Sequence, residues 1–221
     1  MEDQKSGNNY FDQAAASWED SPMRIELTRA IADAIIRQIP LSQTMNAMEF
    51  GCGTGLVAMR IATHVRRLVA VDTSAKMLEV LERKIRQNHI DNIQPLRMDL
   101  TADTFPDERF DLVFTSMAMH HIKDIPHLLG ILNRLLNPGG YLAIADLDTE
   151  DGGFHGDIPD VFHHGFARPA FAGLMETAGF SGINIVTAHI LKKESAKTGL
   201  PADFPVFLAV GNKQASALPA A

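Results

Sequence analysis

The sequence has little cysteine: Cys52 is the only one among 221 residues. A single cysteine excludes a disulfide within the chain and favours a reducing compartment, most simply the cytoplasm. The first residues, MEDQKSGNNYFDQ, are polar and acidic and lack the apolar core of a secretion signal. No apolar run approaches the roughly 18 residues that a transmembrane helix needs. We therefore expect a cytoplasmic protein with no membrane partner.

Positive charge is scarce as well. Lys and Arg number 20 against 27 Asp and Glu, which gives a formal net charge of −7. Nucleic acids and anionic membranes bind clustered Lys and Arg, so this balance argues against a nucleic-acid partner. The one dense basic run, residues 83–86, falls in a predicted helix and is interpreted as a solvated face. Hydrophobic residues make up 46% of the chain, enough for the sizeable core of a globular domain.

Short apolar runs alternate with helical patterns along most of the chain. Strands are expected at residues 45–50, 68–71, 93–98, 110–115, 141–147, 183–190 and 204–210. Helices are expected at residues 22–38, 56–64, 125–136 and 169–179, and another follows Ser74, which can cap it. Strands that alternate with helices predict an α/β protein with a mostly parallel sheet and helices on both faces. The last two strands have no helix between them, so we expect them to pair antiparallel.

Small and polar residues follow the first four strands of this predicted sheet. The carboxyl ends of parallel strands meet at one edge, and ligands bind there. Glycine lets the backbone adopt positive φ and lets a ligand approach closely. An acid at Asp72 can accept both hydroxyl protons of a ribose, and Asp99 can accept from an exocyclic amine such as that of adenine. A single acid after a strand is weak evidence for a ligand site. Glycines and acids that follow successive strands in this order are much more specific evidence.

A dinucleotide site would use similar parts. Its fingerprint, G-x-G-x-x-G, has the third glycine three residues after the second. Here Gly51 and Gly53 fit, but Leu56 occupies the third position and the glycine comes one residue early, at Gly55. This spacing disfavours a pyrophosphate on the helix N-terminus and favours a nucleoside without phosphate.

The combination of motifs resembles the class I S-adenosylmethionine-dependent methyltransferases. The motifs are E-F-G-C-G-T-G, V-D-T-S, R-M-D-L, F-D-L-V-F-T-S-M-A-M-H-H and L-N-P-G-G-Y, and the closest resemblance is to the small-molecule group often typed as UbiE-like. The resemblance covers about residues 45–148. It implies a Rossmann-like seven-stranded sheet in the order 3-2-1-4-5-7-6 with strand 7 antiparallel. We expect a single domain over residues 1–213, made of an N-terminal cap and helix (1–40), a cofactor-binding core (41–148) and a substrate lid (149–168), before a disordered tail of small residues (214–221).

The resemblance further implies S-adenosylmethionine as cofactor and S-adenosylhomocysteine as product. The glycines would approach the methionine part, with Glu49 beneath them, while Ser116 and Met117 would line the cofactor near its sulfonium. Met77 has two interpretations, packing near the adenine or packing in the core of its helix. The expected cofactor site consists of Glu49, Gly51, Cys52, Gly53, Gly55, Asp72, Thr73, Met77, Asp99, Leu100, Ser116 and Met117. Cys52 is interpreted as a structural member of the glycine loop rather than a nucleophile.

Histidines dominate the expected acceptor side. His120 and His121 follow the fourth strand and His155 lies in residues 149–168, and each is a candidate base or substrate-lining residue. The same loop carries His163, His164 and several acids, Asp157 among them. This composition could suggest a metal, but the spacing fits no ligand motif, so no metal is expected and a substrate-facing lid is favoured over a solvated connection. Residues 9–23, with Tyr10, Phe11 and Trp18, would either complete the cover or pack against the sheet.

These features predict in-line methyl transfer to an O, N, S or C nucleophile of a small molecule, by a monomer or a homodimer. A protein or nucleic-acid methyltransferase would usually show N/D-P-P-Y/F after the fourth strand, where this chain has T-S-M-A-M-H-H. A NAD-dependent oxidoreductase is disfavoured by the glycine spacing. A non-catalytic protein that senses the cofactor stays open as an alternative.

Overall fold

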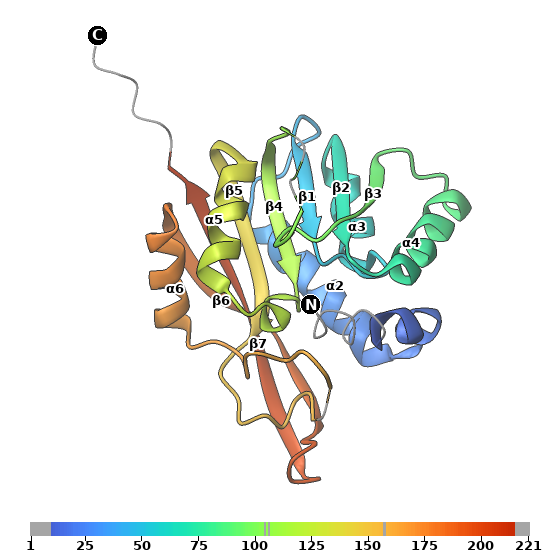
Figure 1. Cartoon of the computed structure of the whole chain (residues 1–221), viewed down its shortest axis with the longest axis vertical. Helices are drawn as coiled ribbons and strands as arrows, with labels where there is room; N and C mark the ends of the chain where they lie inside the picture. The colour runs from blue at the N-terminus through green and yellow to red at the C-terminus, as the bar shows by residue number, and fades with distance from the viewer. Residues whose placement is uncertain (1–9, 104, 106, 157, 215–221) are drawn as a thin grey trace.

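A seven-stranded sheet forms the centre of the molecule in the computed structural model, which describes residues 10–103, 105, 107–156 and 158–214 (Figure 1). The strands are β1 (Asn46–Phe50), β2 (Arg67–Asp72), β3 (Ile93–Arg97), β4 (Phe110–Ser116), β5 (Leu136–Leu147), β6 (Phe180–Glu194) and β7 (Pro201–Lys213). Their order is β3-β2-β1-β4-β5-β7-β6, and β7 pairs antiparallel with both of its neighbours. The predicted order and the antiparallel strand are confirmed.

Helices cover both faces of the sheet, as predicted. They are α2 (Pro22–Gln38), α3 (Leu56–Ile61), α4 (Ala75–Gln87), α5 (Ile125–Leu135) and α6 (Arg168–Thr177), with short 3-10 helices at Ala15–Asp20, Ala62–His64 and Met119–His121. The hydroxyl of Ser74 accepts a hydrogen bond from the Met77 N–H at 3.1 Å, so it caps α4 as expected. No helix in the described part of the chain is long and apolar enough to span a membrane.

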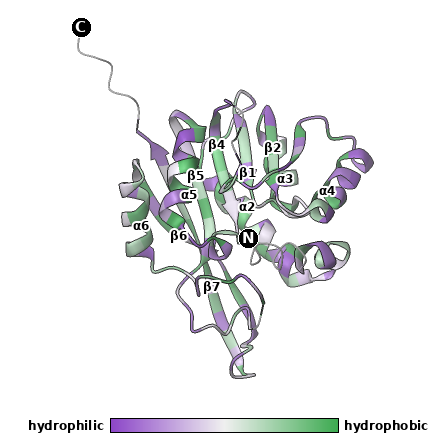
Figure 2. Ribbon diagram, in the orientation of Figure 1, coloured by the Kyte–Doolittle hydropathy of each residue, from purple (hydrophilic) through white to green (hydrophobic). Residues whose placement is uncertain are grey.

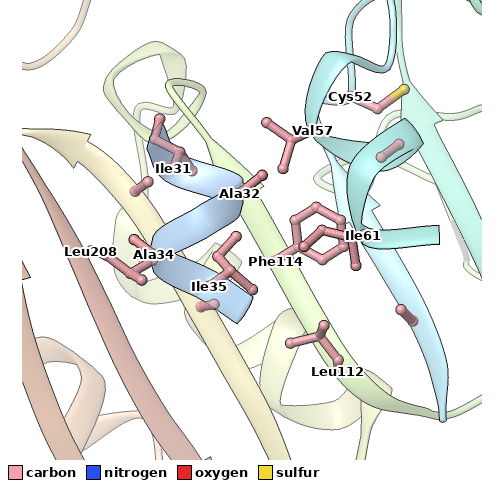
Figure 3. Packing of buried hydrophobic residues seen from close by; sticks show 14 of the residues in the cluster. Ile31, Ala32, Ala34, Ile35, Cys52, Val57, Ile61, Leu112, Phe114 and Leu208 are labelled. Atoms are coloured by element: carbon pink, nitrogen blue, oxygen red, sulfur yellow. The ribbon is translucent and has the colours of Figure 1, made fainter. Parts of the chain in front are cut away.

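Alternation of side chains along the strands produces two separate cores. Leu112 and Phe114 of β4 face α2 and α3, whereas Val113 faces the opposite side, which α5 and α6 cover. Figure 3 shows the first core, where Ile35 of α2 lies toward Phe114 of β4. The central strands are correspondingly the most hydrophobic part of the ribbon in Figure 2. Burial on both faces fixes the register of the sheet, and so it fixes where the strand ends lie.

Two stretches differ from the sequence-based expectation. The stretch Asn137–Gly140, between the predicted helix 125–136 and the predicted strand 141–147, lies within β5 as a bulge, because Leu136 pairs with Phe110 and the next pair joins Tyr141 to Leu112. The β6–β7 hairpin is also longer than expected, since polar residues of β6 such as Lys192 continue to pair with β7. The extended hairpin projects beyond the rest of the sheet, at the bottom of Figure 1. Of the predicted disordered tail, residues 215–221 lie outside the described residues.

A conformational requirement at Gly55 gives a first test. Gly55 has φ of 78° at the start of α3, and a Cβ there would overlap Leu81 Cδ1 in the core. We expect Gly55→Ala to lower the free energy of unfolding by about 1–3 kcal/mol, from the left-handed backbone and the overlap together.

Denaturant unfolding monitored by circular dichroism measures this loss. Gly173→Ala is the matched control, because Gly173 is helical and a Cβ there has no heavy atom within 4 Å. Alanine should stabilise that position by about 0.5–1 kcal/mol. Equal stability of the two variants would contradict the assigned role of Gly55.

Candidate active site

A large cavity of about 850 Å³ opens at the carboxyl ends of β1, β2 and β4. Ligand sites typically enclose about 300–1,000 Å³, so this central cavity has room for more than one small molecule. The cavity lies where the strand order reverses. The chain continues from β1 to its neighbour β2 in one direction across the sheet, and from β4 to its neighbour β5 in the opposite direction. The loop 149–167, the N-terminal segment and the extended part of β6 also contribute to its lining.

Most of the predicted site residues line this cavity. They are Glu49, Gly51, Cys52, Gly53, Asp72, Thr73, Met77, Asp99, Ser116, Met117, His120, His121 and His155. Gly55 and Leu100, also expected in the cofactor site, do not line it. Gly55 instead shapes the start of α3 against Leu81, and Leu100 is only 2% exposed in the core under β1 and β2. Met77 is 1% exposed, in agreement with packing in the core, and it also lines the cavity, so its place near the adenine stays a prediction.

Asp72 organises the loop that carries the glycines. Its Oδ2 accepts a hydrogen bond from the Gly53 N–H at 2.7 Å, and its Oδ1 accepts one from the Ser74 N–H at 2.8 Å. Burial raises the pKa of Asp72, and these N–H groups only partly oppose the rise. At Gly51, φ is 68° and a Cβ would lie 2.7 Å from Ala118 Cβ, so only glycine fits between β1 and the loop after β4.

Glu49 and Cys52 are both buried beside this loop. Burial raises the pKa of Glu49 well above its usual value, and Glu49 Oε2 has no hydrogen-bond partner among the described residues. Such a buried, unpartnered oxygen fits a donor from a bound molecule. Burial likewise raises the pKa of the Cys52 thiol, which opposes formation of the nucleophilic thiolate. Cys52 therefore behaves as the structural residue that the sequence predicts.

Asp99 lies in a compact turn after β3. Its Oδ1 accepts hydrogen bonds from the Thr101 N–H at 2.9 Å and the Thr101 hydroxyl at 2.6 Å. The Asp99 N–H in turn donates to Asp103 Oδ2 at 2.9 Å. These bonds fix the direction of the carboxylate at the cavity wall. Glu49, Asp72, Asp99 and Asp103 thus all lie on the β1–β3 side of the cavity.

Three histidines gather on the other side and form what we call the histidine cluster: His120, His121 and His155. The ring centroids of His120 and His121 are 4.3 Å apart, and those of His120 and His155 are 4.4 Å apart. The loop after β5 therefore brings His155 against the residues that follow β4. In the described part of the chain no group of His, Cys, Asp or Glu has the arrangement to hold a metal ion.

A buried carboxylate, Asp146, supports the cluster from beneath. Asp146 Oδ1 lies 2.8 Å from His120 Nδ1, and both side chains are at most 1% exposed. Burial alone would raise the pKa of Asp146, but the adjacent His120 and hydrogen bonds from backbone N–H groups outweigh it and lower that pKa. With the Nδ1–H donated to Asp146, His120 Nε2 is left as the proton acceptor. Sequence reasoning missed Asp146, although an acid inside the apolar run Y-L-A-I-A-D-L was a signal.

The other two imidazoles are held neutral. Burial and the positive charge of a protonated His120 lower the pKa of His121 to about 4. Burial, His120 and His121 lower the pKa of His155 to about 3. Near neutral pH His121 and His155 are therefore uncharged, and His120 is the ring of the cluster that lies against the carboxylate of Asp146.

Two segments cover the cavity. In the N-terminal segment, Asp12 accepts hydrogen bonds from the Ser74 hydroxyl and the Lys76 N–H, and the ring of Phe11 contacts that of His121 edge-on at 5.3 Å. In the loop after β5, the Phe162 N–H donates to the His120 carbonyl oxygen at 2.9 Å. Both segments therefore lie over residues of the cavity, which supports their interpretation as covers. Asp157 lies outside the described residues.

Sequence reasoning also missed Lys193 of β6, which lines the cavity. Its ammonium donates to the Phe154 carbonyl oxygen at 2.6 Å and lies 4.6 Å from the centre of the Phe154 ring. Lysine in the polar run L-K-K-E carries no sequence signal for a binding site, because only the length of the hairpin brings it there.

Comparison with known proteins agrees with this geometry. Residues 47–140 match the family model described as a methyltransferase domain. An uncharacterized methyltransferase of Schizosaccharomyces pombe is 33% identical over 157 residues, which are 64% of this chain and 55% of that protein. A 27-O-demethylrifamycin SV methyltransferase of Amycolatopsis mediterranei is 30% identical over 132 residues, 58% of this chain and 48% of that protein. The chain thus spans about half the length of these curated relatives.

A solved structure shows the same fold. The N-methyltransferase NodS from Bradyrhizobium japonicum, in complex with S-adenosylhomocysteine, gives a TM-score of 0.69 at 17% identity and covers 94% of this chain and 98% of its own. The family match over residues 47–140, the motifs and the sheet order agree on a class I S-adenosylmethionine-dependent methyltransferase domain, and they support S-adenosylmethionine as its cofactor. The named relatives differ in their acceptors, so they define the class rather than the UbiE-like group within it.

The neutral state of His155 predicts a pH dependence of stability. In the unfolded chain an ordinary histidine takes up a proton as the pH falls through about 6.5, whereas folded His155 stays neutral until about pH 3. The unfolded state then binds more protons, so the free energy of unfolding should fall as the pH decreases from 6.5. We expect His155→Gln to flatten this dependence between pH 6.5 and 4.5.

Urea unfolding at several pH values measures the two slopes. His64→Gln, in the 3-10 helix after α3 and outside the cluster, controls for the loss of a histidine as such. If the free energy of unfolding of His155→Gln changed with pH as steeply as that of the wild type, this result would show that His155 titrates normally in the folded protein.

Proposed function

We propose that this protein transfers a methyl group from S-adenosylmethionine to a small-molecule acceptor, with His120 as the base when the acceptor carries a proton. The single observation that carries the proposal is the central cavity, which has carboxylates on one side and the Asp146-supported His120 on the other. The first side suits a nucleoside cofactor, and the second suits removal of a proton from an acceptor.

The residues present fit the cofactor. Asp72 keeps lone pairs beyond its two backbone bonds and would hold the ribose hydroxyls, and Asp99 would accept from the adenine amine. Gly51 and Gly53 leave the backbone open to the methionine part, while the unpartnered Glu49 Oε2 would accept from a donor there. Thr73, Met77, Ser116, Met117 and Cys52 complete the proposed binding site; for Gly55 and Leu100 we propose a structural role.

When bound, the cofactor supplies a methyl group on a sulfonium, and an acceptor lone pair forms the new bond to carbon as the carbon–sulfur bond breaks, leaving S-adenosylhomocysteine. The protein's contribution is positioning, which in well-oriented systems lowers a barrier by roughly 7–11 kcal/mol. His120 Nε2 takes the acceptor proton, and the Asp146 carboxylate stabilises the imidazolium that results. His121 and His155 line the acceptor as neutral side chains, and the two covering segments exclude water.

A small molecule is the proposed acceptor because the N-terminal segment and the loop after β5 both line the cavity and narrow the access to it. A protein or nucleic-acid substrate would need an open surface leading to the same site. A cytoplasmic location and a monomeric or homodimeric state belong to this proposal and rest on the sequence. A cofactor sensor without turnover is the remaining alternative, and it would lack any need for the pair of His120 and Asp146.

Cofactor binding tests the first part of the proposal. We expect Asp72→Ala to weaken S-adenosylmethionine binding by about tenfold to hundredfold, because hydrogen bonds to a charged group contribute about 1.5–3 kcal/mol. Isothermal titration calorimetry measures the loss. Asp91→Ala, an exposed acid beyond the cavity, should bind like the wild type. No binding by the wild type, or equal binding by all three proteins, would refute the proposed site.

Turnover tests the second part. Phenols, amines, thiols and carboxylates are screened for release of S-adenosylhomocysteine, and the best acceptor is used with Asp146→Asn and His120→Ala. We expect kcat to fall by about a hundredfold in each variant while the cofactor Kd stays unchanged. His189→Ala, a histidine of β6 outside the cavity, is the control.

The pH profile separates proton transfer from packing. Loss of the acid limb of kcat in His120→Ala supports a base, whereas a uniform drop at all pH values indicates a structural role. Absence of turnover with every acceptor class, together with intact cofactor binding, would favour the sensor.

A further inference from the structure

Among the residues that the structure describes, Lys193 has no ion-pair partner at its end of the cavity. Among the described residues no carboxylate lies within 4 Å of its ammonium, which uses one N–H on the Phe154 carbonyl oxygen. Burial lowers the pKa of Lys193, and Glu150 acts on it only from a distance. Glu150 Oε2 is itself occupied by the N–H groups of Gly152 and Phe154. Two ammonium donors are therefore left for another acceptor.

The position of Lys193 relates it to the proposed base. Lys193 lies over one part of the Phe154 ring, and the same ring contacts His155 edge-on with centroids 4.6 Å apart. His155 in turn lies against His120. Lys193 and His120 thus bound the same end of the cavity from β6 and from the loop after β4.

The surfaces between these two groups are largely apolar. Leu191 of β6, Phe154 and Phe11 line this part of the cavity together with the neutral rings of His121 and His155. Flat, apolar walls of this kind suit an aromatic body. An amine acceptor would carry a positive charge toward Lys193. Glu49, Asp72, Asp99 and Asp103 lie on the β1–β3 side of the cavity, and Asp124 and Asp160 line it elsewhere.

From this arrangement we propose that the acceptor is an aromatic hydroxy acid, whose carboxylate binds Lys193 and whose hydroxyl reaches His120. The inference rests on the proposed function and names its substrate class. The carboxylate is already ionised near neutral pH and needs no base, so the hydroxyl is the group that His120 serves. The hydroxyl proton moves to His120 Nε2, the oxygen gains the methyl group, and the product is a methyl ether that retains its carboxylate.

Binding to the protein saturated with S-adenosylhomocysteine tests this inference independently of turnover. The probes are 4-hydroxybenzoate, 4-hydroxyphenylacetate and 4-hydroxycinnamate, each paired with its carboxamide, and tyramine as the cationic counterpart. Calorimetry should show at least one carboxylate bound about tenfold or more tightly than its carboxamide, since a charged hydrogen bond is lost in the amide. Tyramine should bind more weakly than either.

Variants of Lys193 identify the source of the preference. Lys193→Met should abolish the preference for carboxylate over carboxamide and leave the Kd of S-adenosylhomocysteine unchanged. Lys193→Arg keeps the positive charge and should retain the preference. Lys192→Met is the matched control, because the exposed Lys192 precedes Lys193 on β6 and does not line the cavity. A merely structural role for Lys193 would weaken both members of each pair equally.

The outcomes separate the two proposals. Failure of the wild type to bind S-adenosylhomocysteine would refute the proposed function itself. If the cofactor binds normally, three results would overturn the substrate class and leave the proposed function standing. These are that no carboxylate binds, that tyramine is preferred, or that the product is a methyl ester.

Discussion

The parallel pairing of β1 with β4 in the middle of the sheet determines where the loops after these two strands lie, and so where the cavity opens. Its register joins Ala47 to Leu112 and Phe50 to Thr115, and side chains of both strands are buried on both faces. Because the two strands end at the same edge but the chain leaves them toward opposite sides, the following loops must diverge and a cavity opens between them. A register shift of one residue would exchange the two cores, so the geometry of the site is protected by the hydrophobic packing beneath it.

The same divergence separates two kinds of electrostatic environment. On the β1–β3 side, carboxylates are held by backbone N–H groups, as Asp72 is by Gly53 and Ser74. On the other side, burial keeps His121 and His155 neutral, and only His120 has a carboxylate beneath it. A cofactor that carries hydroxyls, an amine and a sulfonium fits the first environment, and an acceptor that must lose a proton fits the second. The division explains why one cavity can serve two different molecules.

The sequence predicts the sheet order, the capping of α4 by Ser74 and most of the residues that line the β1–β3 side of the cavity, because these features depend on local patterns that directly follow the strands. It does not predict Lys193, since strand β6 continues through polar residues only by pairing with β7. Nor does it assign Asp146 to His120, because that contact joins residues of two different strands. The residues Asn137–Gly140 follow the predicted helix, but the pairing of Leu136 with Phe110 places them inside β5. Each feature that the sequence does not predict therefore depends on pairing between residues that are far apart in the chain.

The central claim is that the acids after β2 and β3 hold the cofactor while the histidine cluster faces the acceptor. A crystal structure of the protein with S-adenosylhomocysteine tests it most directly. The account predicts density for the ribose hydroxyls at Asp72, for the adenine amine at Asp99, and for the sulfur on the side of the cavity that His120 lines. Density with the adenine against the histidine cluster, or with the cofactor outside the cavity, would contradict the account.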